Sequence, residues 1–173
     1  PGDQDMVGLQ WSEAMSVGVP ALDDDHRCLV RIINLLENVR ENDSSQVADR
    51  VLDTLGIYCR CHFAREEQVM AVCDFPALTF HRSEHERFTE MVRRLRERHS
   101  ADQDSGHDSN MARELLERLT AWLRHHILIQ DMAYKPYVQD RWDGTATLPE
   151  MPSLSHGHVG MSSMDTVVET TSQ

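Results

Sequence analysis

Four stretches of the chain carry apolar residues at intervals of three and four positions, which is the spacing of one face of an α-helix. The stretches span residues 20–40, 46–72, 78–99 and 111–138. The segments between them are polar or contain Gly or Pro, as connections between helices usually do. We find no alternation of apolar and polar residues that would indicate a strand, and no internal repeat. The pattern predicts an all-α fold, an up-and-down antiparallel four-helix bundle.

The two ends of the chain lack this helical spacing. Residues 1–19 mix apolar and turn-forming residues, so we expect an extended N-terminal arm with Trp11 and Val17 lying against the core. Residues 141–173 are rich in Gly, Ser, Thr and Pro, which predicts a disordered C-terminal tail or a linker. The bundle itself is therefore expected over residues 20–140.

The charge of the chain limits what it can bind. Its 173 residues include 29 Asp and Glu against 17 Lys and Arg, a formal net charge of −12. This excess disfavours nucleic acid and anionic membrane surfaces, because binding to both depends on Lys and Arg that neutralise phosphates. No apolar run reaches the roughly 20 residues of a membrane-spanning helix, and the N-terminus lacks the order of a secretory signal. We expect a soluble, cytoplasmic protein.

Two further features have plain structural interpretations. The four cysteines are too few and too unevenly spaced for a disulfide scaffold, so we expect reduced thiols in or near the core. They are Cys28, Cys59, Cys61 and Cys73. The acidic run at residues 23–25 is expected in the first turn of a helix, where carboxylates favour the positive end of the helix dipole. It lacks the Gly and the later Glu of an EF-hand calcium loop.

Histidines and carboxylates occupy positions that a four-helix bundle normally fills with apolar side chains. His62 and Glu66 are four residues apart, as are His81 and His85, so each pair lies on one face of its helix. The first stretch adds His26, in phase with its apolar residues. The fourth adds His125, His126 and Asp131. A single core histidine is usually just hydrogen-bonded, but so many buried polar groups call for a compensating cation, which indicates a metal centre.

Four short motifs together resemble the hemerythrin family, non-haem di-iron proteins that bind O2, including the bacterial hemerythrin-like domains. The motifs are LDDDH at 22–26, HFAREE at 62–67, HRSEH at 81–85 and HILIQD at 126–131. Their order and spacing both match over roughly residues 9–138, and the combination is specific although each motif alone is weak. The resemblance implies a bundle that holds two Fe ions joined by an oxo or hydroxo bridge from solvent.

The resemblance also implies which residues hold each iron ion. One ion would be held by His81, His85 and His126. The other would be held by His26 and His62 and would keep an open position. Glu66 and Asp131 would bridge the two ions.

The fourth stretch poses a geometric problem for this ligand set. The resemblance favours His126 over His125, because the family places its histidine five residues before the carboxylate of Asp131. On an ideal α-helix five residues turn about 500°, which leaves the two side chains about 140° apart. They can reach one centre only if the carboxylate extends sideways or the helix widens locally. His125 is expected to point away from the site.

Apolar side chains fall where the family lines its O2 pocket. They are Phe63, Met70, Phe88, Trp122, Leu123, Ile127 and Tyr134. Their interpretation as ordinary core residues does not compete with this role, because an apolar wall excludes water and protons from the site. Leu123 lies one turn before His126 and is the candidate nearest the open iron position.

Some residues depart from the family pattern or lie outside it. Asp25 stands just before the first histidine, where the family often has an amide or Glu, so the local hydrogen bonding is expected to change. Four further histidines fall in predicted loops or the tail and are expected to be solvent-exposed. They are His99, His107, His156 and His158.

The proportion of ligand types bears on function. Di-iron oxidases typically use more carboxylates, with repeated Glu-x-x-His pairs, whereas this set has five imidazoles and two carboxylates. We therefore expect reversible O2 binding, for storage, delivery or sensing, rather than an enzyme. Two alternatives stay open: a module that signals O2, NO or redox state to a partner or a fused output domain, and a di-iron enzyme that handles peroxide or NO.

Overall fold

The computed structural model describes residues 9–37, 39, 44–104 and 111–151. Every regular element within these ranges is helical. In chain order the elements are η1 (Glu13–Met15), α1 (Pro20–Asn34), α2 (Ser44–Val72), α3 (Leu78–Asp104), α4 (Met111–His125), η3 (His126–Asp131) and α5 (Met132–Arg141). η1 is a single 3-10 turn, and η3 is a π-helical segment.

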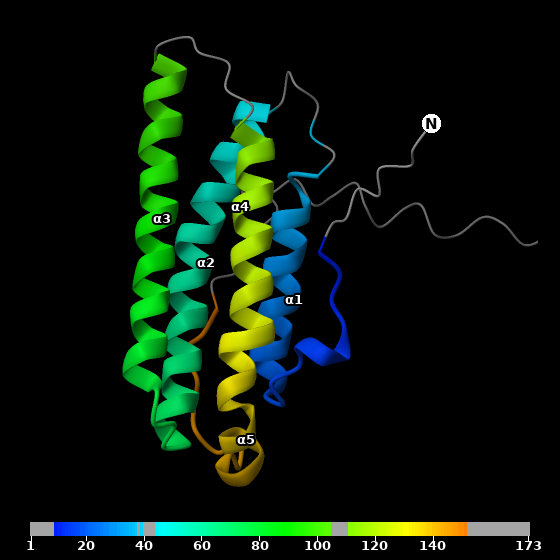
Figure 1. Ribbon diagram of the computed structural model, residues 1–173, viewed down its shortest axis with the longest axis vertical. Coiled ribbons are helices and arrows are strands. Elements are labelled where there is room, and N and C mark those ends of the chain that lie inside the picture. The colour runs from blue at the N-terminus through cyan, green and yellow to red at the C-terminus, as the bar shows by residue number, and fades with distance from the viewer. Residues whose placement is uncertain (1–8, 38, 40–43, 105–110, 152–173) are drawn as a thin grey trace, which may run out of the picture.

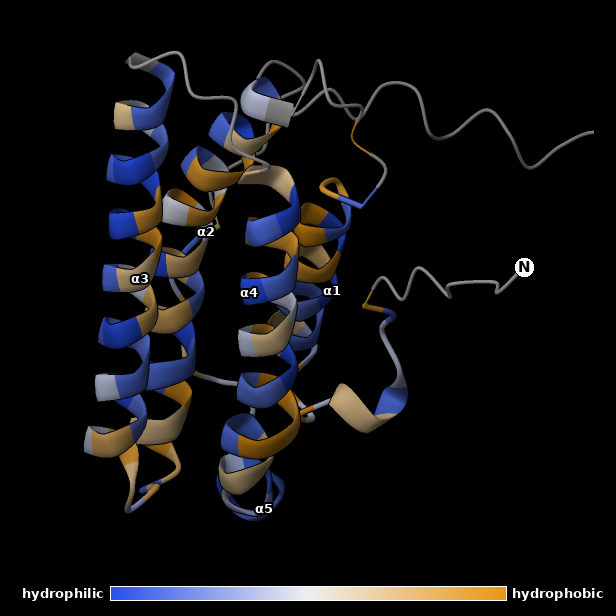
Figure 2. Ribbon diagram, turned by 45° about the horizontal axis from the view of Figure 1, so that its top comes forward, coloured by the Kyte–Doolittle hydropathy of each residue, from blue (hydrophilic) through white to orange (hydrophobic). Residues whose placement is uncertain are grey.

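α1 to α4 form the up-and-down antiparallel bundle that the sequence predicts (Figure 1). α2 packs against α1, α3 and α4, and η3 and α5 continue α4, so that these three elements form one rod. α1 to α4 each carry a polar and an apolar face (Figure 2). The buried apolar residues form two clusters, one around Leu55 and Leu119 and one around Met70 and Tyr134.

The helix bounds differ from the predicted ones at four ends. α2 begins at Ser44, two residues before its predicted start. α1 ends at Asn34 instead of residue 40, and residues 35–37 form a turn in which Leu36 is still buried. α3 continues to Asp104, and the fourth rod continues to Arg141. An exposed final turn carries no apolar periodicity, so the pattern cannot locate where it ends.

The described part of the N-terminal arm packs on the bundle as predicted. Val17 is fully buried, and the partly buried Trp11 packs against the core with the Arg27 guanidinium 4.6 Å from the centroid of its ring. Asp23 accepts hydrogen bonds from Ser16 Oγ (2.7 Å) and from the backbone N–H of Val17 (2.8 Å). The acidic run therefore helps to fasten the arm to the first turn of α1.

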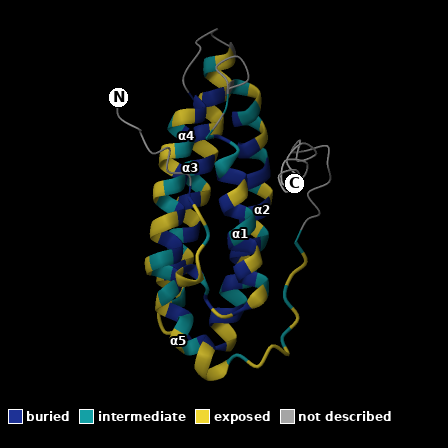
Figure 3. Ribbon diagram, turned by 90° about the vertical axis from the view of Figure 1, so that its right-hand side faces the viewer, coloured by how far each residue is buried: buried dark blue, intermediate teal, exposed yellow. Residues whose placement is uncertain are grey.

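Residues 142–151, which we call the strap, correct the expectation of a disordered tail for this part of the chain. Gly144, whose φ is 75°, lies in the bend after α5. The strap then runs back beside α2 (orange in Figure 1, and seen from another side in Figure 3). Leu148 and Met151 are partly buried against the two apolar clusters. Residues 152–173 lie outside the described residues.

The cysteines agree with the prediction of reduced thiols. All four lie in the described part of the chain and none forms a disulfide; Cys59 and Cys73 are buried. Burial raises the pKa of the Cys59 thiol well above its ordinary value, which keeps that thiol protonated and unreactive. No helix within the described ranges has the length and apolar character needed to cross a bilayer.

Candidate metal centre

The structure brings the seven predicted ligand residues together between the two apolar clusters. They come from all four rods: His26 (α1), His62 and Glu66 (α2), His81 and His85 (α3), and His126 and Asp131 (η3). Each is at most 3% exposed. Each rod therefore contributes an imidazole to one buried volume.

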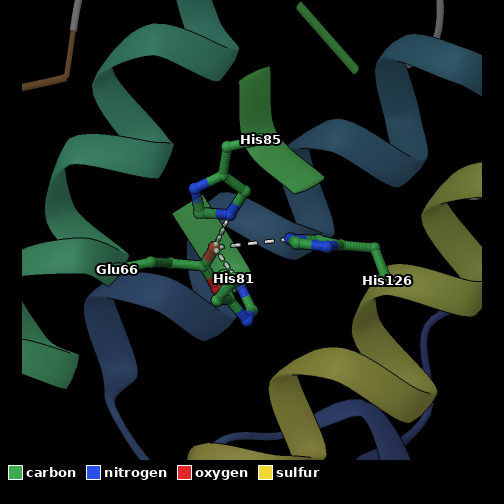
Figure 4. A group of neighbouring side chains, drawn as sticks. All are labelled: Glu66, His81, His85 and His126. Atoms are coloured by element: carbon green, nitrogen blue, oxygen red, sulfur yellow. Dashed lines mark hydrogen bonds and ion pairs between the residues drawn. The ribbon is translucent and has the colours of Figure 1, made fainter. Parts of the chain in front are cut away.

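The first group of side chains surrounds Glu66. Glu66 Oε2 lies 3.1 Å from His85 Nε2, 3.5 Å from His126 Nε2 and 3.8 Å from His81 Nε2. Figure 4 shows the three imidazoles around this carboxylate, each with a nitrogen directed at it. One ligand atom of each of the four residues lies within 4.8 Å of the others, a spacing that allows them to hold one metal ion.

The second group shares the same carboxylate. His26 Nε2 lies 3.5 Å from Glu66 Oε1, and His62 Nε2 lies 3.6 Å from Glu66 Oε2. These three residues also present ligand atoms within 4.8 Å of one another. Glu66 therefore belongs to both groups and separates two potential metal positions.

Asp131 also lies between the two groups of imidazoles. Its Oδ2 is 3.3 Å from His26 Nε2, and its Oδ1 is 3.3 Å from both His81 Nε2 and His126 Nε2. Like Glu66, it contacts imidazoles of both groups, which is the position a bridging carboxylate needs.

The geometric problem of the fourth rod is solved by a local widening of the helix. The π-helical segment spans His126 to Asp131, so both side chains turn inward and both are fully buried. His125, the last residue of α4, is exposed, as predicted. π-bulges of this kind frequently occur at functional sites, because they re-aim a side chain at the cost of one regular turn.

Unpartnered polar atoms test whether the site fits a metal ion. Buried atoms without a hydrogen-bond partner include the Nε2 atoms of His26, His62, His81 and His126 and both carboxylate oxygens of Asp131. Several of these imidazole nitrogens and carboxylate oxygens face each other at 3.3 to 3.8 Å, yet no hydrogen bond forms at them. Buried polar groups rarely go unsatisfied, so lone pairs directed at a shared centre fit bound cations.

The electrostatics of the site point the same way. Burial alone would lower the pKa of His26, but the carboxylates of Asp131 and Glu66 outweigh it and raise the pKa to about 10. Burial would raise the pKa of Glu66, but His62 and His126, with other nearby imidazoles, lower it well below its ordinary value. Protons and metal ions therefore compete for the same imidazole atoms.

Three polar side chains that the sequence patterns did not assign to the centre hold the outer nitrogens of the imidazoles. Glu67 Oε1 lies 3.0 Å from His85 Nδ1, Gln130 Oε1 lies 2.7 Å from His126 Nδ1, and Asp25 Oδ2 lies 3.4 Å from His62 Nδ1. Such contacts fix the orientation of a ligating histidine. Gln130 could have been found from its spacing of four after His126, whereas the Glu67 contact spans two helices.

Tyr134 differs from its predicted role as part of an apolar wall. It is fully buried, but its hydroxyl donates a hydrogen bond of 2.7 Å to Glu66 Oε1. Burial and the nearby Glu66 and Asp131 carboxylates raise the pKa of Tyr134 well above its ordinary value, so the hydroxyl keeps its proton. Tyr134 thus supports a candidate bridging carboxylate.

The other predicted pocket residues divide between the two apolar clusters. Phe63 stacks on His85 with ring centroids 3.9 Å apart, and Trp122 stacks on His126 at 4.4 Å. Phe88 lies against both Phe63 and Trp122. Leu123 and Ile127 are buried in the same cluster, whereas Met70 packs in the other cluster with Tyr134.

The expectation that His99 is solvent-exposed is wrong. It is 2% exposed, and its Nε2–H donates to the backbone oxygen of Ser45 at 3.2 Å, with Asp49 Oδ1 also at 3.2 Å. The reason is that α3 continues past His99 and packs this turn against the start of α2. His107, His156 and His158 lie outside the described residues.

Comparisons with known proteins agree with this geometry. Residues 17–138 match the family model described as the hemerythrin HHE cation binding domain. The chain is similar to bacteriohemerythrin of Ralstonia nicotianae, with 30% identity over 136 residues, which cover 79% of this chain and 93% of that protein. It is also similar to bacteriohemerythrin of Stenotrophomonas maltophilia, with 29% identity over 78% of this chain and 84% of that protein. The family match contains all seven candidate ligands and stops before the strap.

Proposed function

Because this chain belongs to the hemerythrin family, we propose that it binds O2 reversibly at a non-haem di-iron centre, for oxygen storage, delivery or sensing. The observation that carries the proposal is the convergence of five imidazoles and two carboxylates in one buried volume, with metal-binding atoms left unpartnered. The hemerythrin family consists of oxygen-binding proteins, and this chain is one of them rather than an enzyme.

The proposed ligand assignment follows the two groups of side chains. His81, His85 and His126 would hold one iron ion, and His26 and His62 would hold the other. Glu66 and Asp131 would bridge them, because each lies close to imidazoles of both groups. Two Fe(II) ions held by this set would supply the two electrons that reversible O2 binding requires, one from each ion.

The surrounding side chains keep the site dry and its carboxylates in place. Phe63 and Trp122 cover two of the imidazoles by stacking, and Leu123 and Ile127 are buried in the same cluster. Excluding water slows the protonation that would make O2 binding irreversible. The Tyr134 hydroxyl holds Glu66 through the hydrogen bond to its Oε1.

We also propose limits for the domain and a location in the cell. We assign the oxygen-binding bundle to residues 20–140, flanked by the N-terminal arm and the C-terminal segment. Four cysteines without a disulfide support a cytoplasmic location, because thiols persist where the compartment is reducing.

The test is a cycle of oxygenation and deoxygenation. The full chain is loaded anaerobically with Fe(II), exposed to air and then freed of O2 while its visible spectrum is followed. We expect a charge-transfer band that appears with O2 and disappears on its removal. His126→Ala should abolish the band, and His125→Ala, which changes an exposed neighbour, should preserve it. Rapid conversion to the diferric state with no reversible band would contradict reversible O2 binding and favour redox signalling or turnover chemistry.

A further inference from the structure

A continuous series of contacts joins the strap to His62. His62 Nδ1–H donates to Asp25 Oδ2 at 3.4 Å. Arg65 Nη1 donates to both oxygens of Asp25, at 2.9 and 3.1 Å. Arg65 Nε donates to the backbone oxygen of Pro149 at 2.5 Å. The strap thus reaches a candidate metal ligand through two intervening side chains.

Both intervening side chains are well enclosed. The side chain of Asp25 is 4% exposed and that of Arg65 is 15% exposed. Asp25 also accepts a hydrogen bond of 3.3 Å from the Tyr58 hydroxyl. A buried carboxylate needs such partners, and among the partners named here Arg65 is the one that brings a guanidinium group.

The strap has its own attachment to the bundle. Gln68 Nε2 donates to the backbone oxygen of Thr147 at 2.8 Å. Leu148 packs against the apolar cluster around Met70, and Met151 packs against the other cluster. The Pro149 carbonyl therefore has a fixed place between these contacts, and it can hold the Arg65 guanidinium through Nε while Nη1 contacts Asp25.

We propose that Arg65 is a positioning residue of the metal centre: the strap holds its guanidinium on Asp25, and Asp25 holds the ring of His62 with Nε2 directed at the metal position. The inference rests on the proposed function, since it takes His62 to be an iron ligand. The rigid fork of a guanidinium suits this task, because separate N–H groups engage Asp25 and Pro149 at the same time.

Loss of the Arg65 contacts is expected to affect only the iron ion that His26 and His62 would hold. Neither Arg65 nor the strap has a described contact with His81, His85 or His126. Loss of the Arg65 contacts should therefore weaken the iron held by His26 and His62 and leave the other iron unchanged. Removing a group that orients a metal ligand typically lowers metal affinity about 10–100-fold.

The first experiment compares full-length chains loaded anaerobically with Fe(II) in competition with a chelator. Arg65→Gln should weaken one of the two ions about 10–100-fold. Arg65→Lys should fall between, because an ammonium keeps the charge but not the fork. Arg60→Gln, which removes an exposed arginine of the same helix, should change neither ion.

A second readout does not depend on iron. In the metal-free chain, ¹⁵N NMR of the His62 ring shows which nitrogen carries the proton. We expect the His62 ring to carry its proton on Nδ1 in the unsubstituted chain and to be a mixture of both tautomers in Arg65→Gln. A residue that only supported the fold would not move this signal while the rest of the spectrum stayed native.

A third comparison isolates the strap. Leu148→Asp puts a carboxylate against an apolar cluster and should detach the strap, weakening the same ion as Arg65→Gln by a smaller factor. Glu150→Gln, an exposed change in the strap, should have no effect. If Arg65→Gln acts and Leu148→Asp does not, the part assigned to the strap is wrong.

The outcomes separate this inference from the proposed function. If the unsubstituted chain holds fewer than two iron ions, the proposed function is wrong. The measurement of the His62 ring alone then decides the inference about Arg65. The inference is overturned if the unsubstituted chain holds two iron ions and Arg65→Gln changes neither their affinities nor the His62 tautomer. The proposed function is then left intact.

Discussion

In both halves of the metal centre an arginine contacts a carboxylate, and that carboxylate contacts a candidate ligand histidine. The surroundings of these three side chains differ between the half that contains His62 and the half that contains His85. In one half a carboxylate and an arginine stand behind His62; in the other, Glu67 contacts His85 Nδ1 and accepts a hydrogen bond from Arg82 Nε at 2.7 Å. The arginine of the first half is 15% exposed and strap-bound, whereas Arg82 is 50% exposed. An exposed ion pair contributes about 0–1 kcal/mol. The same arrangement is therefore expected to matter on the strap side and to matter little on the other.

A surface groove accounts for much of this difference. It runs between α2 and α3, and its lining includes Phe63, Glu67, Arg82 and His85. The Glu67–Arg82 pair is open to solvent, with side chains 22% and 50% exposed, and solvent screening weakens the effect of such a pair. The strap has no counterpart over this groove among the described residues. How firmly a ligand is held thus depends on what covers its outer contacts, and not only on which residues make them.

The largest expected effect comes from the carboxylate that the two halves share. Glu66→Gln removes the charge that lies close to imidazoles of both groups, so we expect both iron ions to be lost. Metal analysis after anaerobic loading and desalting checks this. Glu97→Gln, the same change at an exposed position of α3, is the matched control and should keep two ions. A Glu66→Gln chain with one tightly held ion would show that the halves assemble separately.

A smaller effect is expected from the apolar cover. Leu123→Ala opens space one turn before His126 and should speed irreversible oxidation of the oxygenated protein severalfold by admitting water. The change should also lower the free energy of unfolding by about 2–5 kcal/mol, as for other buried leucines. Leu119→Ala, an equally buried leucine one turn further away, should cost similar stability. If both variants oxidise at the same rate, packing in general and not cover of the site controls oxidation.

The smallest expected effect is on the exposed arginine. Arg82→Gln should change the affinity for either iron ion less than about fivefold, because an exposed pair is worth at most about 1 kcal/mol. Chelator competition, run beside Arg65→Gln, measures both variants on one scale. Equal losses in the two variants would remove the distinction between the halves.

The parts of this molecule that could be predicted from sequence are those with a period. Apolar spacing identified the four rods, and polar residues on those apolar faces identified the candidate imidazoles and carboxylates. The choice of His126 over His125 came from the resemblance to the hemerythrin family. The five-residue step from His126 to Asp131 predicted that the helix must widen or the carboxylate must reach sideways, and the structure shows a π-helical segment there. In each case a repeat of fixed length relates sequence position to direction in space.

The parts that could not be predicted depend on contacts without a period. The strap binds through the backbone oxygens of Thr147 and Pro149, and every residue type has such an oxygen. The burial of His99 depends on where an exposed helix end stops. In the sequence Tyr134 is one more aromatic residue of the core, and only the fold places its hydroxyl beside Glu66. Tertiary neighbours decide these features, and residue identity alone does not reveal them.

The most direct test of the central claim is a crystal structure of the Fe-loaded chain with data collected at the iron absorption edge. The account predicts two anomalous peaks between Glu66 and Asp131, one beside the Nε2 atoms of His26 and His62 and the other beside those of His81, His85 and His126. A single peak in fully loaded crystals, or peaks away from these imidazoles, would contradict it.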